Sequence, residues 1–387
     1  MADEDNAYSF TTSATREISL VNPGGEGFKM WRGDSLDEVT LAYESWGELS
    51  PAADNAIIIF TGLSPSAHAA SSSQDPSPGW WEYMIGPGKA IDTDRFFVVC
   101  ANSLGGCYGS TGPTSLNPAT GKRYGADFPD VTVEDIASSG YHLMRELGVN
   151  KLHAAVGSSM GGMSSIAYAL QYPGEIDYVV SISAATRALP LTIALRSLQR
   201  EIIRSDPDWQ QGHYSDERKP LSGMSLARKL GLVSYRAADE WNSKFDRSRL
   251  PAEKLTGKRF EREFEIENYL EYNAQKFVNS FDPNSYLYLS RAMDWFDIAE
   301  HGTSLQDGMS RLDVRKALVV GVTTDILFPA RQQKEIADLM QQTGTAVDYV
   351  EIDSVNGHDA FLIDDAHFSP VVKRFLDESL LPGRKAR

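Results

Sequence analysis

Short runs of apolar, β-branched and aromatic residues recur along the chain, separated by stretches with helical periodicity. Several runs are almost continuously hydrophobic, which is typical of strands covered on both faces, as in a mostly parallel sheet. Residues 131–147 and 330–343 carry helical spacing between such runs. This alternation predicts an α/β fold. We expect strands at residues 39–43, 56–60, 96–100, 152–156, 178–182, 317–321 and 347–352.

The pattern changes between residues 187 and 301. This stretch is rich in charged and aromatic residues at helical spacing, as in 193–203, and it contains no clear buried strand. We interpret residues 187–301 as a helical lid inserted into a core formed by 1–186 and 302–387. Open α/β sheets bind ligands at the carboxyl ends of their strands, so we expect the lid to cover that edge.

One local motif predicts chemistry. Gly157-Ser158-Ser159-Met160-Gly161 directly follows the apolar run 152–156 and precedes a segment with helical spacing. A G-x-S-x-G segment that leaves a strand and enters a helix is the nucleophile elbow of the α/β-hydrolase fold. A Gly/Ser-rich loop could match the five letters by chance, but the strand and the helix on either side favour the elbow.

A serine hydroxyl needs a neighbouring base, and that base needs a third group to orient it. In this fold the order along the chain is serine, acid, histidine. His358 follows the expected strand 347–352, and Asp325 follows the strand that ends near residue 322. We therefore predict a triad of Ser159, Asp325 and His358, although Asp325 taken alone could be a solvated turn residue. The other two histidines in this part of the chain are interpreted as ordinary surface residues: His301 and His367.

The tetrahedral oxyanion formed during acyl transfer needs two backbone N–H donors. Met160, the residue after the nucleophile, supplies one. The loop after strand 56–60 supplies the other, and Leu63 is the candidate because Gly62 lets the backbone approach closely.

Composition limits the partners and the location. The chain has 387 residues, of which 42% are hydrophobic, and its net charge is −16. Such an acidic chain is not expected to bind nucleic acid or an anionic membrane, although a local basic patch could hold a phosphorylated cosubstrate. Two cysteines outside any C-x-x-C motif argue against a disulfide framework or a zinc site. With no apolar run of about 18 residues and an acidic N-terminus, we expect a cytoplasmic protein without a metal or a bound cofactor.

Further motifs extend over most of the chain, and with them it resembles the homoserine/serine O-acyltransferase family of the α/β-hydrolase superfamily. The matching segments are residues 79–82, 85–89, 92–96, 102–113, 128–135, 159–163, 286–294 and 357–361. The resemblance implies a Ser159-bound acyl-enzyme formed from acyl-CoA, either succinyl-CoA or acetyl-CoA. It also implies that Arg200 holds the α-carboxylate of an amino-acid acceptor, that Asp359 holds its ammonium group, and that the chain is a homodimer. Without the resemblance, we would interpret Arg200 as a charged residue on the surface of a helix.

In four segments the chain is more similar to the serine O-succinyltransferase subgroup: residues 61–70, 188–190, 193–200 and 293–297. Common homoserine acetyltransferases have Gly-Asp where this chain has Ser64-Pro65, and Asn-Glu where it has Arg196-Ser197. We expect residues Gly62, Leu63, Ser64 and Pro65 to set the length of the acceptor. We expect a substrate tunnel under the lid, and Arg196 would meet the second carboxylate of a succinyl group if its side chain faces this tunnel.

The sequence thus predicts O-succinylation of L-serine, a step of cysteine biosynthesis. Homoserine O-acetyl- or O-succinyltransferase of methionine biosynthesis is the alternative, and a serine esterase is the next. A binding module that has lost catalysis is disfavoured by the intact triad.

Overall fold

An eight-stranded sheet forms the centre of the computed structural model, which describes residues 11–20 and 27–381. The first two pairs in the sheet, β1–β4 and β4–β8, are antiparallel, and every later pair is parallel. The fold is therefore the predicted α/β-hydrolase type. Across the sheet the strands are β1 (Arg16–Leu20), β4 (Val39–Trp46), β8 (Phe97–Ala101), β5 (Ala56–Phe60), β9 (Leu152–Ser158), β10 (Ile176–Ile182), β11 (Lys316–Val322) and β12 (Val347–Ile352).

All seven expected strands are present, and the sequence analysis missed β1. This edge strand is mostly exposed and has a single buried residue, Leu20, so it carries no hydrophobic run. Two small two-stranded sheets were also not predicted. One is antiparallel and joins β2 (Phe28–Lys29) to β3 (Ser35–Leu36). The other is parallel and joins β6 (Ile85–Gly86) to β7 (Ile91–Asp92).

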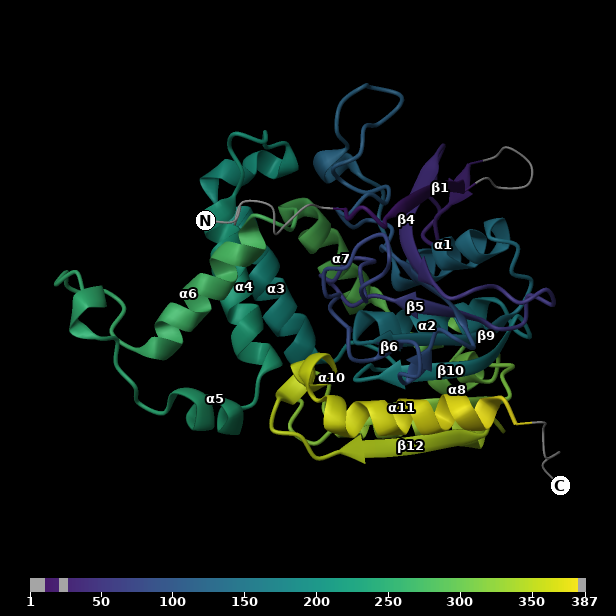
Figure 1. Cartoon of the computed structure of the whole chain (residues 1–387). Helices are drawn as coiled ribbons and strands as arrows, with labels where there is room; N and C mark the ends of the chain where they lie inside the picture. The colour runs from purple at the N-terminus through teal and green to yellow at the C-terminus, as the bar shows by residue number, and fades with distance from the viewer. Residues whose placement is uncertain (1–10, 21–26, 382–387) are drawn as a thin grey trace.

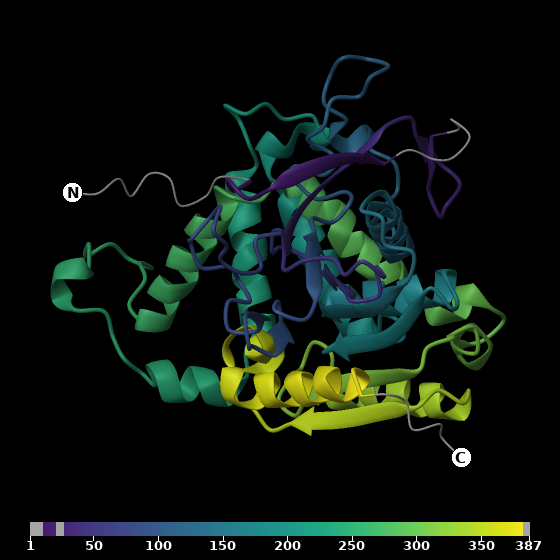
Figure 2. The same cartoon turned by 45° about the vertical axis from the view of Figure 1, so that its right-hand side comes forward.

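Helices and loops cover both faces of the sheet, which explains the hydrophobic runs. In β5, Ile58 and Phe60 join a core cluster on one face, whereas Ile57 and Ile59 join a second cluster on the other. The first face is packed by α1 (Val133–Glu146), α2 (Met160–Gln171) and α9 (Ala330–Gln342). The second is packed by α11 (Asp365–Ser379), which lies against β12 in Figures 1 and 2.

Between β10 and β11 the chain forms helices joined by loops, with isolated bridges, one of which joins Arg187 to Asp297. Figure 1 shows α3, α4 and α6 beyond the arrowhead of β12, which is the carboxyl end of the parallel strands. The division into a core and a lid at residues 187 and 301 stays a prediction. The helices here are α3 (Pro190–Ser205), η3 (Pro207–Gly212), α4 (Leu221–Tyr235), α5 (Ala238–Phe245), η4 (Ala252–Lys254), α6 (Glu265–Val278), α7 (Pro283–Trp295), η5 (Ile298–His301) and α8 (Leu305–Met309).

The turn from β9 into α2 depends on close contacts between backbones. Ser159 has φ 55° and ψ −121°, a conformation that non-glycine residues rarely adopt. A Cβ on Gly157 would lie 2.1 Å from the carbonyl oxygen of Gly161, and a Cβ on Gly161 would lie 2.0 Å from that of Phe60. Both glycines are therefore required for the elbow to form against the end of β5.

Two further observations concern the helices and the cysteines. Throughout the described ranges, each helix is too short or too polar to traverse a lipid bilayer. Cys100 and Cys107 are both buried free thiols.

Substitution of Gly161 by alanine tests the close contact at the elbow. We expect Gly161→Ala to lower the free energy of unfolding by about 3 kcal/mol, because the new methyl group overlaps the Phe60 carbonyl. Gly148→Ala is the control: its Cβ meets no heavy atom within 4 Å, so only its φ of +81° costs stability, about 1 kcal/mol. Equal losses in urea denaturation for the two variants would show that the contact is not needed.

Candidate active site

Three loops at the carboxyl edge of the sheet bring the predicted triad together. Ser159 follows β9, Asp325 follows β11, and His358 lies in η6 (Gly357–Asp359) after β12. His358 Nε2 is 2.9 Å from Ser159 Oγ, and His358 Nδ1 is 2.7 Å from Asp325 Oδ2. All three side chains are buried. The geometry is that of a serine nucleophile, a base and an orienting acid.

The Asp325 carboxylate is held by its own loop. Its Oδ1 accepts hydrogen bonds from the backbone N–H groups of Leu327 and Phe328, both at 2.8 Å, which leaves Oδ2 for His358. Because a carboxylate accepts, Nδ1 of His358 carries the hydrogen and Nε2 is free to take a proton from Ser159.

The electrostatics of His358 suit a base that becomes transiently charged. Burial lowers the pKa of His358, but the charge of Asp325 and its hydrogen bond outweigh burial, so the pKa lies above 6.5. Asp325 thus stabilises the imidazolium ion that forms when Ser159 loses its proton.

The end of α4 packs directly on the loop that carries the base. Gly357 has φ +64°, and a Cβ there would lie 2.7 Å from the carbonyl oxygen of Tyr235. The rings of Phe328 and Phe361 lie 5.3 and 5.6 Å from that of His358, and Tyr235 lies at 6.1 Å. The histidine is therefore enclosed by apolar rings from both the core and the helical region.

The two predicted oxyanion donors belong to adjacent pieces of backbone. Met160 is the first residue of α2, where helical N–H groups have no partner within the helix. Leu63 lies in the loop after β5 and lines the same cavity as Ser159. The contact of Gly161 with Phe60 holds this loop against the elbow.

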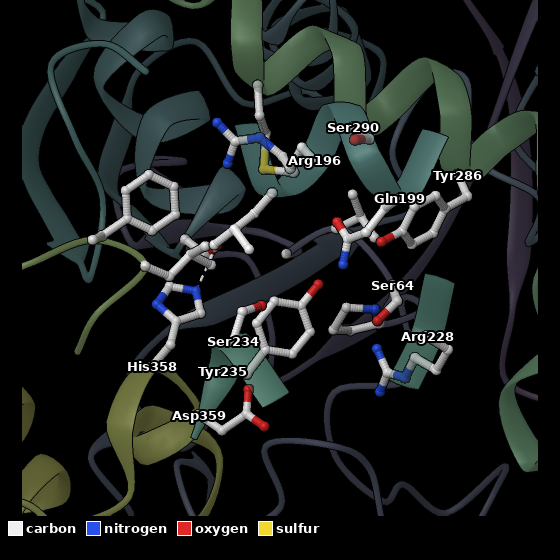
Figure 3. A pocket seen from close by; sticks show the side chains of 18 of the residues that line it. Ser64, Arg196, Gln199, Arg228, Ser234, Tyr235, Tyr286, Ser290, His358 and Asp359 are labelled. Atoms are coloured by element: carbon white, nitrogen blue, oxygen red, sulfur yellow. Dashed lines mark hydrogen bonds between the residues drawn. The ribbon is translucent and has the colours of Figure 1, made fainter. Parts of the chain in front are cut away.

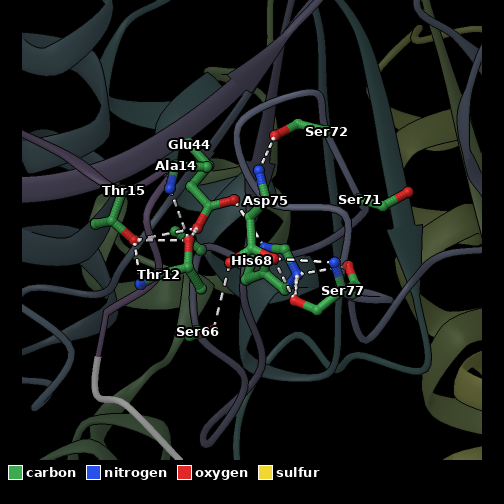
Figure 4. A network of polar contacts seen from close by, with 12 residues as sticks. Thr12, Ala14, Thr15, Glu44, Ser66, His68, Ser71, Ser72, Asp75 and Ser77 are labelled. Carbon is green, nitrogen blue, oxygen red and sulfur yellow. Dashed lines mark hydrogen bonds and ion pairs between the residues drawn. The ribbon is translucent and has the colours of Figure 1, made fainter.

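A polar network anchors the loop that carries Leu63, as Figure 4 shows. The buried His68 contacts Glu44 Oε2 of β4 at 2.9 Å through Nδ1 and the Ser77 carbonyl oxygen at 3.0 Å through Nε2. The Ala67 N–H donates to Asn102 Oδ1 at 2.5 Å. The segment that follows Leu63 is thereby tied to β4 and to the loop after β8.

A cavity lies over the triad. Ser159 and His358 are among its lining residues. The predicted specificity segment Gly62, Leu63, Ser64 and Pro65 lines it, as do Arg196 and Asp359. Further polar lining residues were missed by the sequence analysis: Gln199, Arg228, Ser234, Tyr235, Tyr286 and Ser290.

Arg196 faces the cavity, which the sequence alone left open. Its side chain is 5% exposed, and its Nε donates to Asp294 Oδ1 at 2.6 Å. Within the described part of the chain, neither Nη1 nor Nη2 of Arg196 has a hydrogen-bond partner. Figure 3 shows Arg196 and Arg228 entering the cavity from different sides. A buried guanidinium with two free nitrogens fits a carboxylate.

The role of Arg200 at the acceptor carboxylate stays a prediction. Arg200 is absent from the lining of this cavity; its Nη1 donates to Ser290 Oγ at 2.9 Å, and its Nη2 pairs with Asp294 Oδ2 at 2.7 Å. Arg200 lies one helical turn after Arg196, and both arginines contact Asp294 of α7. The α3 residues that line the cavity are Leu195, Arg196 and Gln199.

Arg228 is the second arginine of the cavity. It comes from α4, its guanidinium lies 4.3 Å from the ring centre of Phe277, and its charge lowers the pKa of nearby Asp359. Burial raises the pKa of Asp359 more than His358, Arg236 and Arg228 lower it. Nothing in the sequence separates Arg228 from the other cations of the helical region, because only the packing of α4 turns it inward.

The remaining histidines differ from each other. His367 is exposed, as expected, and contacts Asp364 at 2.7 Å. His301 is buried and pairs with Glu134 at 3.3 Å, so its interpretation as a surface residue was wrong. His301 lies in η5, and its contact with Glu134 joins η5 to α1. Across residues 11–20 and 27–381, no cluster of three or more histidine, cysteine or acidic side chains could hold a metal ion.

Known proteins share this fold and much of this sequence. Residues 55–365 match the family model described as the α/β hydrolase fold. A serine O-succinyltransferase from Litchfieldella anticariensis is 54% identical over 367 residues, covering 95% of this chain and 99% of that protein. A homoserine O-acetyltransferase structure from Bacillus anthracis aligns with a TM-score of 0.84 at 28% identity, over 94% of this chain and 98% of that one. The structure of esterase E22 aligns with a TM-score of 0.83 at 30% identity, over 94% and 100%.

A Ser-His-Asp arrangement at the carboxyl edge of a mostly parallel sheet defines the class of serine-nucleophile enzymes with the α/β-hydrolase fold. Identity over almost the whole length of both chains narrows this class. The chain belongs to the α/β hydrolase family and, within it, to the serine O-succinyltransferase family.

The His68 anchor predicts a pH-dependent stability. Burial lowers the pKa of His68, but the hydrogen bond to Glu44 and its charge raise it more, so the folded-state pKa exceeds 6.5. A raised histidine pKa stabilises the fold fully below pH 6.5, and this stabilisation is lost as pH rises through the folded-state pKa. We expect His68→Gln to lose about 1–3 kcal/mol at low pH and less at high pH.

Urea denaturation between about pH 5 and pH 9 measures this difference. His367→Gln is the matched control, because His367 is exposed and its pair with Asp364 is worth little. A loss in His68→Gln that grows with pH would contradict the sign derived from the Glu44 contact.

Proposed function

We propose that this chain transfers the succinyl group of succinyl-CoA to the hydroxyl of L-serine, giving O-succinyl-L-serine and CoA. The observation that carries the proposal is the buried Arg196, which lines the cavity that contains Ser159 and His358 and whose two terminal nitrogens have no hydrogen-bond partner. The identity of 54% to a serine O-succinyltransferase supports the same substrates.

In the first step, His358 Nε2 takes the Ser159 proton, and Ser159 Oγ attacks the thioester carbonyl carbon. The N–H groups of Leu63 and Met160 stabilise the oxyanion. Collapse of this intermediate breaks the C–S bond, and CoA leaves as the thiol with the proton from His358. The product is a succinyl ester on Ser159.

In the second step, His358 takes the proton of the acceptor hydroxyl, whose oxygen attacks the ester carbonyl carbon. Ser159 leaves and regains a proton from His358. Water must be kept from the ester, because it would hydrolyse the acyl-enzyme. Burial of the triad under the helices between β10 and β11 serves that purpose, and in this role residues 187–301 act as a lid.

Arg196 selects the donor. A succinyl group carries a terminal carboxylate that can accept from both Nη1 and Nη2, whereas an acetyl group would leave them unpaired. An unpaired buried charge is costly, so the cavity favours the dicarboxylic acyl group.

Arg228 and Asp359 recognise the acceptor. Both line the cavity beside His358, and a guanidinium suits the α-carboxylate while a carboxylate suits the ammonium group. We therefore assign to Arg228 the part that the sequence analysis gave to Arg200. Segment 62–65 limits the acceptor to a short side chain, since Pro65 stiffens it.

We also infer a cytoplasmic homodimer that acts in cysteine biosynthesis and needs acyl-CoA only as a cosubstrate. The identity of 54% to a serine O-succinyltransferase supports acyl-CoA as the cosubstrate.

Homoserine O-acetylation is the second candidate, and it is favoured by the alignment with the homoserine O-acetyltransferase of Bacillus anthracis. Ester hydrolysis is the third, because esterase E22 aligns equally well. The same triad serves all three reactions, so the acyl donor and the acceptor distinguish them.

Initial rates of thiol release test the proposal with succinyl-CoA or acetyl-CoA against L-serine or L-homoserine. We expect the highest kcat/KM with succinyl-CoA and L-serine, with the product confirmed by mass, and no turnover in Ser159→Ala. Arg196→Gln should lower kcat/KM for succinyl-CoA by about tenfold or more, because a charged partner is lost. Preference for acetyl-CoA with homoserine would support the second candidate, and thiol release independent of acceptor the third.

The pH profile tests the base. Protonated His358 cannot accept the Ser159 proton, so kcat/KM should fall on the acid side with an apparent pKa above 6.5. Asp325→Asn removes the charge that raises this pKa. We expect its acid limb to move to lower pH and its kcat to fall by a factor on the order of 10³–10⁴. An unchanged limb in this variant would exclude the Asp325 contact as the cause.

A further inference from the structure

Two arginines share one carboxylate behind the cavity. Asp294 of α7 is 7% exposed; its Oδ1 accepts from Arg196 Nε at 2.6 Å, and its Oδ2 pairs with Arg200 Nη2 at 2.7 Å. Arg200 is in turn fixed by Ser290 Oγ at 2.9 Å. The three charges form a chain from Arg200 through Asp294 to Arg196.

The way in which Asp294 binds Arg196 leaves a defined edge of the guanidinium free. A carboxylate that pairs end-on with an arginine uses both terminal nitrogens. Asp294 instead accepts from Nε, so the buried Nη1 and Nη2 stay without a hydrogen-bond partner. A guanidinium held only by its flexible stem could rotate and pair end-on with Asp294, and the contact to Nε prevents that arrangement.

The charge balance of this group points to an anionic ligand. The buried Arg196 and the half-buried Arg200 face one carboxylate, which leaves one positive charge of this group uncompensated. The Arg196 guanidinium lies 5.7 Å from the ring centre of Phe328, the same ring that lies 5.3 Å from His358. The free edge of Arg196 is thus close to the reacting centre.

We propose that Asp294 is a positioning residue for donor selection: it orients Arg196 so that its terminal nitrogens meet the distal carboxylate of the acyl group. This inference rests on the proposed function. Arg200 supports the orientation by holding the second oxygen of Asp294, which gives a role to the arginine that does not reach the cavity. Asp294 itself is not a lining residue of the cavity, so we expect it to act through Arg196 and not on the substrate directly.

The test compares kcat/KM for succinyl-CoA and acetyl-CoA in Asp294→Asn, Arg196→Gln and the double variant. Asparagine keeps the shape of Asp294 but removes its charge. We expect Asp294→Asn to lower the succinyl-CoA to acetyl-CoA ratio about tenfold and to change the acetyl-CoA value little. On the Arg196→Gln background, Asp294→Asn should have no further effect on the ratio, because the residue acts through Arg196.

Asp297→Asn is the matched control, since Asp297 caps η5 two residues after α7 and is absent from the cavity lining. It should keep the wild-type ratio. Arg200→Gln tests the same chain of contacts from Arg200, which is more exposed than Asp294. It should lower the succinyl-CoA to acetyl-CoA ratio a few-fold. This variant keeps the inference testable if Asp294→Asn does not fold.

The outcomes separate this inference from the proposed function. If wild type prefers succinyl-CoA and Arg196→Gln loses that preference while Asp294→Asn keeps it, only the positioning role is overturned. Equal losses for both donors in Asp294→Asn, or a full effect on the Arg196→Gln background, would also overturn it. If wild type does not prefer succinyl-CoA, the proposed function and this inference both fail.

Discussion

The close packing of three backbone segments at the elbow is the constraint on which the site depends. Gly157 and Gly161 let β9 and α2 meet without side chains, and Gly161 rests on the carbonyl oxygen of Phe60. The turn holds Ser159 at a positive φ and brings the loop after β5 beside it. The nucleophile and its two backbone donors are therefore fixed by the same contact, before any lining residue is considered.

On this rigid frame the helices after β10 add charges that the core does not need for folding. Arg196 and Arg228 enter the cavity from α3 and α4, and Asp359 lies beside the base. Buried charges without full pairing destabilise a protein, so their retention is best explained by ligands that complete the pairing. In the function that we propose, the triad serves acyl transfer in general, and these charges set the choice of donor and acceptor.

The strands, the elbow and the triad could be predicted because each depends on local sequence. Hydrophobic runs give the buried strands, and Asp325 and His358 follow strands whose ends meet at one edge. The lining was less accessible, because helical spacing does not reveal how a helix is rotated on its neighbours. The sequence therefore did not single out Arg228 as a lining residue. It also left the orientation of Arg196 open, because that orientation depends on the contact with Asp294 of α7. The mostly exposed β1 and the buried His301 were also missed, because each depends on a partner elsewhere in the chain. β1 pairs with β4, and His301 contacts Glu134.

The acyl-enzyme itself gives the most direct test of the central claim that Ser159 carries a succinyl group selected by the cavity. The protein would be mixed briefly with equal concentrations of succinyl-CoA and acetyl-CoA without acceptor, quenched in acid, and its intact mass measured. The account predicts one added succinyl group per chain, located on the peptide that contains Ser159 and absent from Ser159→Ala. A predominant acetyl adduct, or a succinyl adduct that persists in Ser159→Ala, would contradict it.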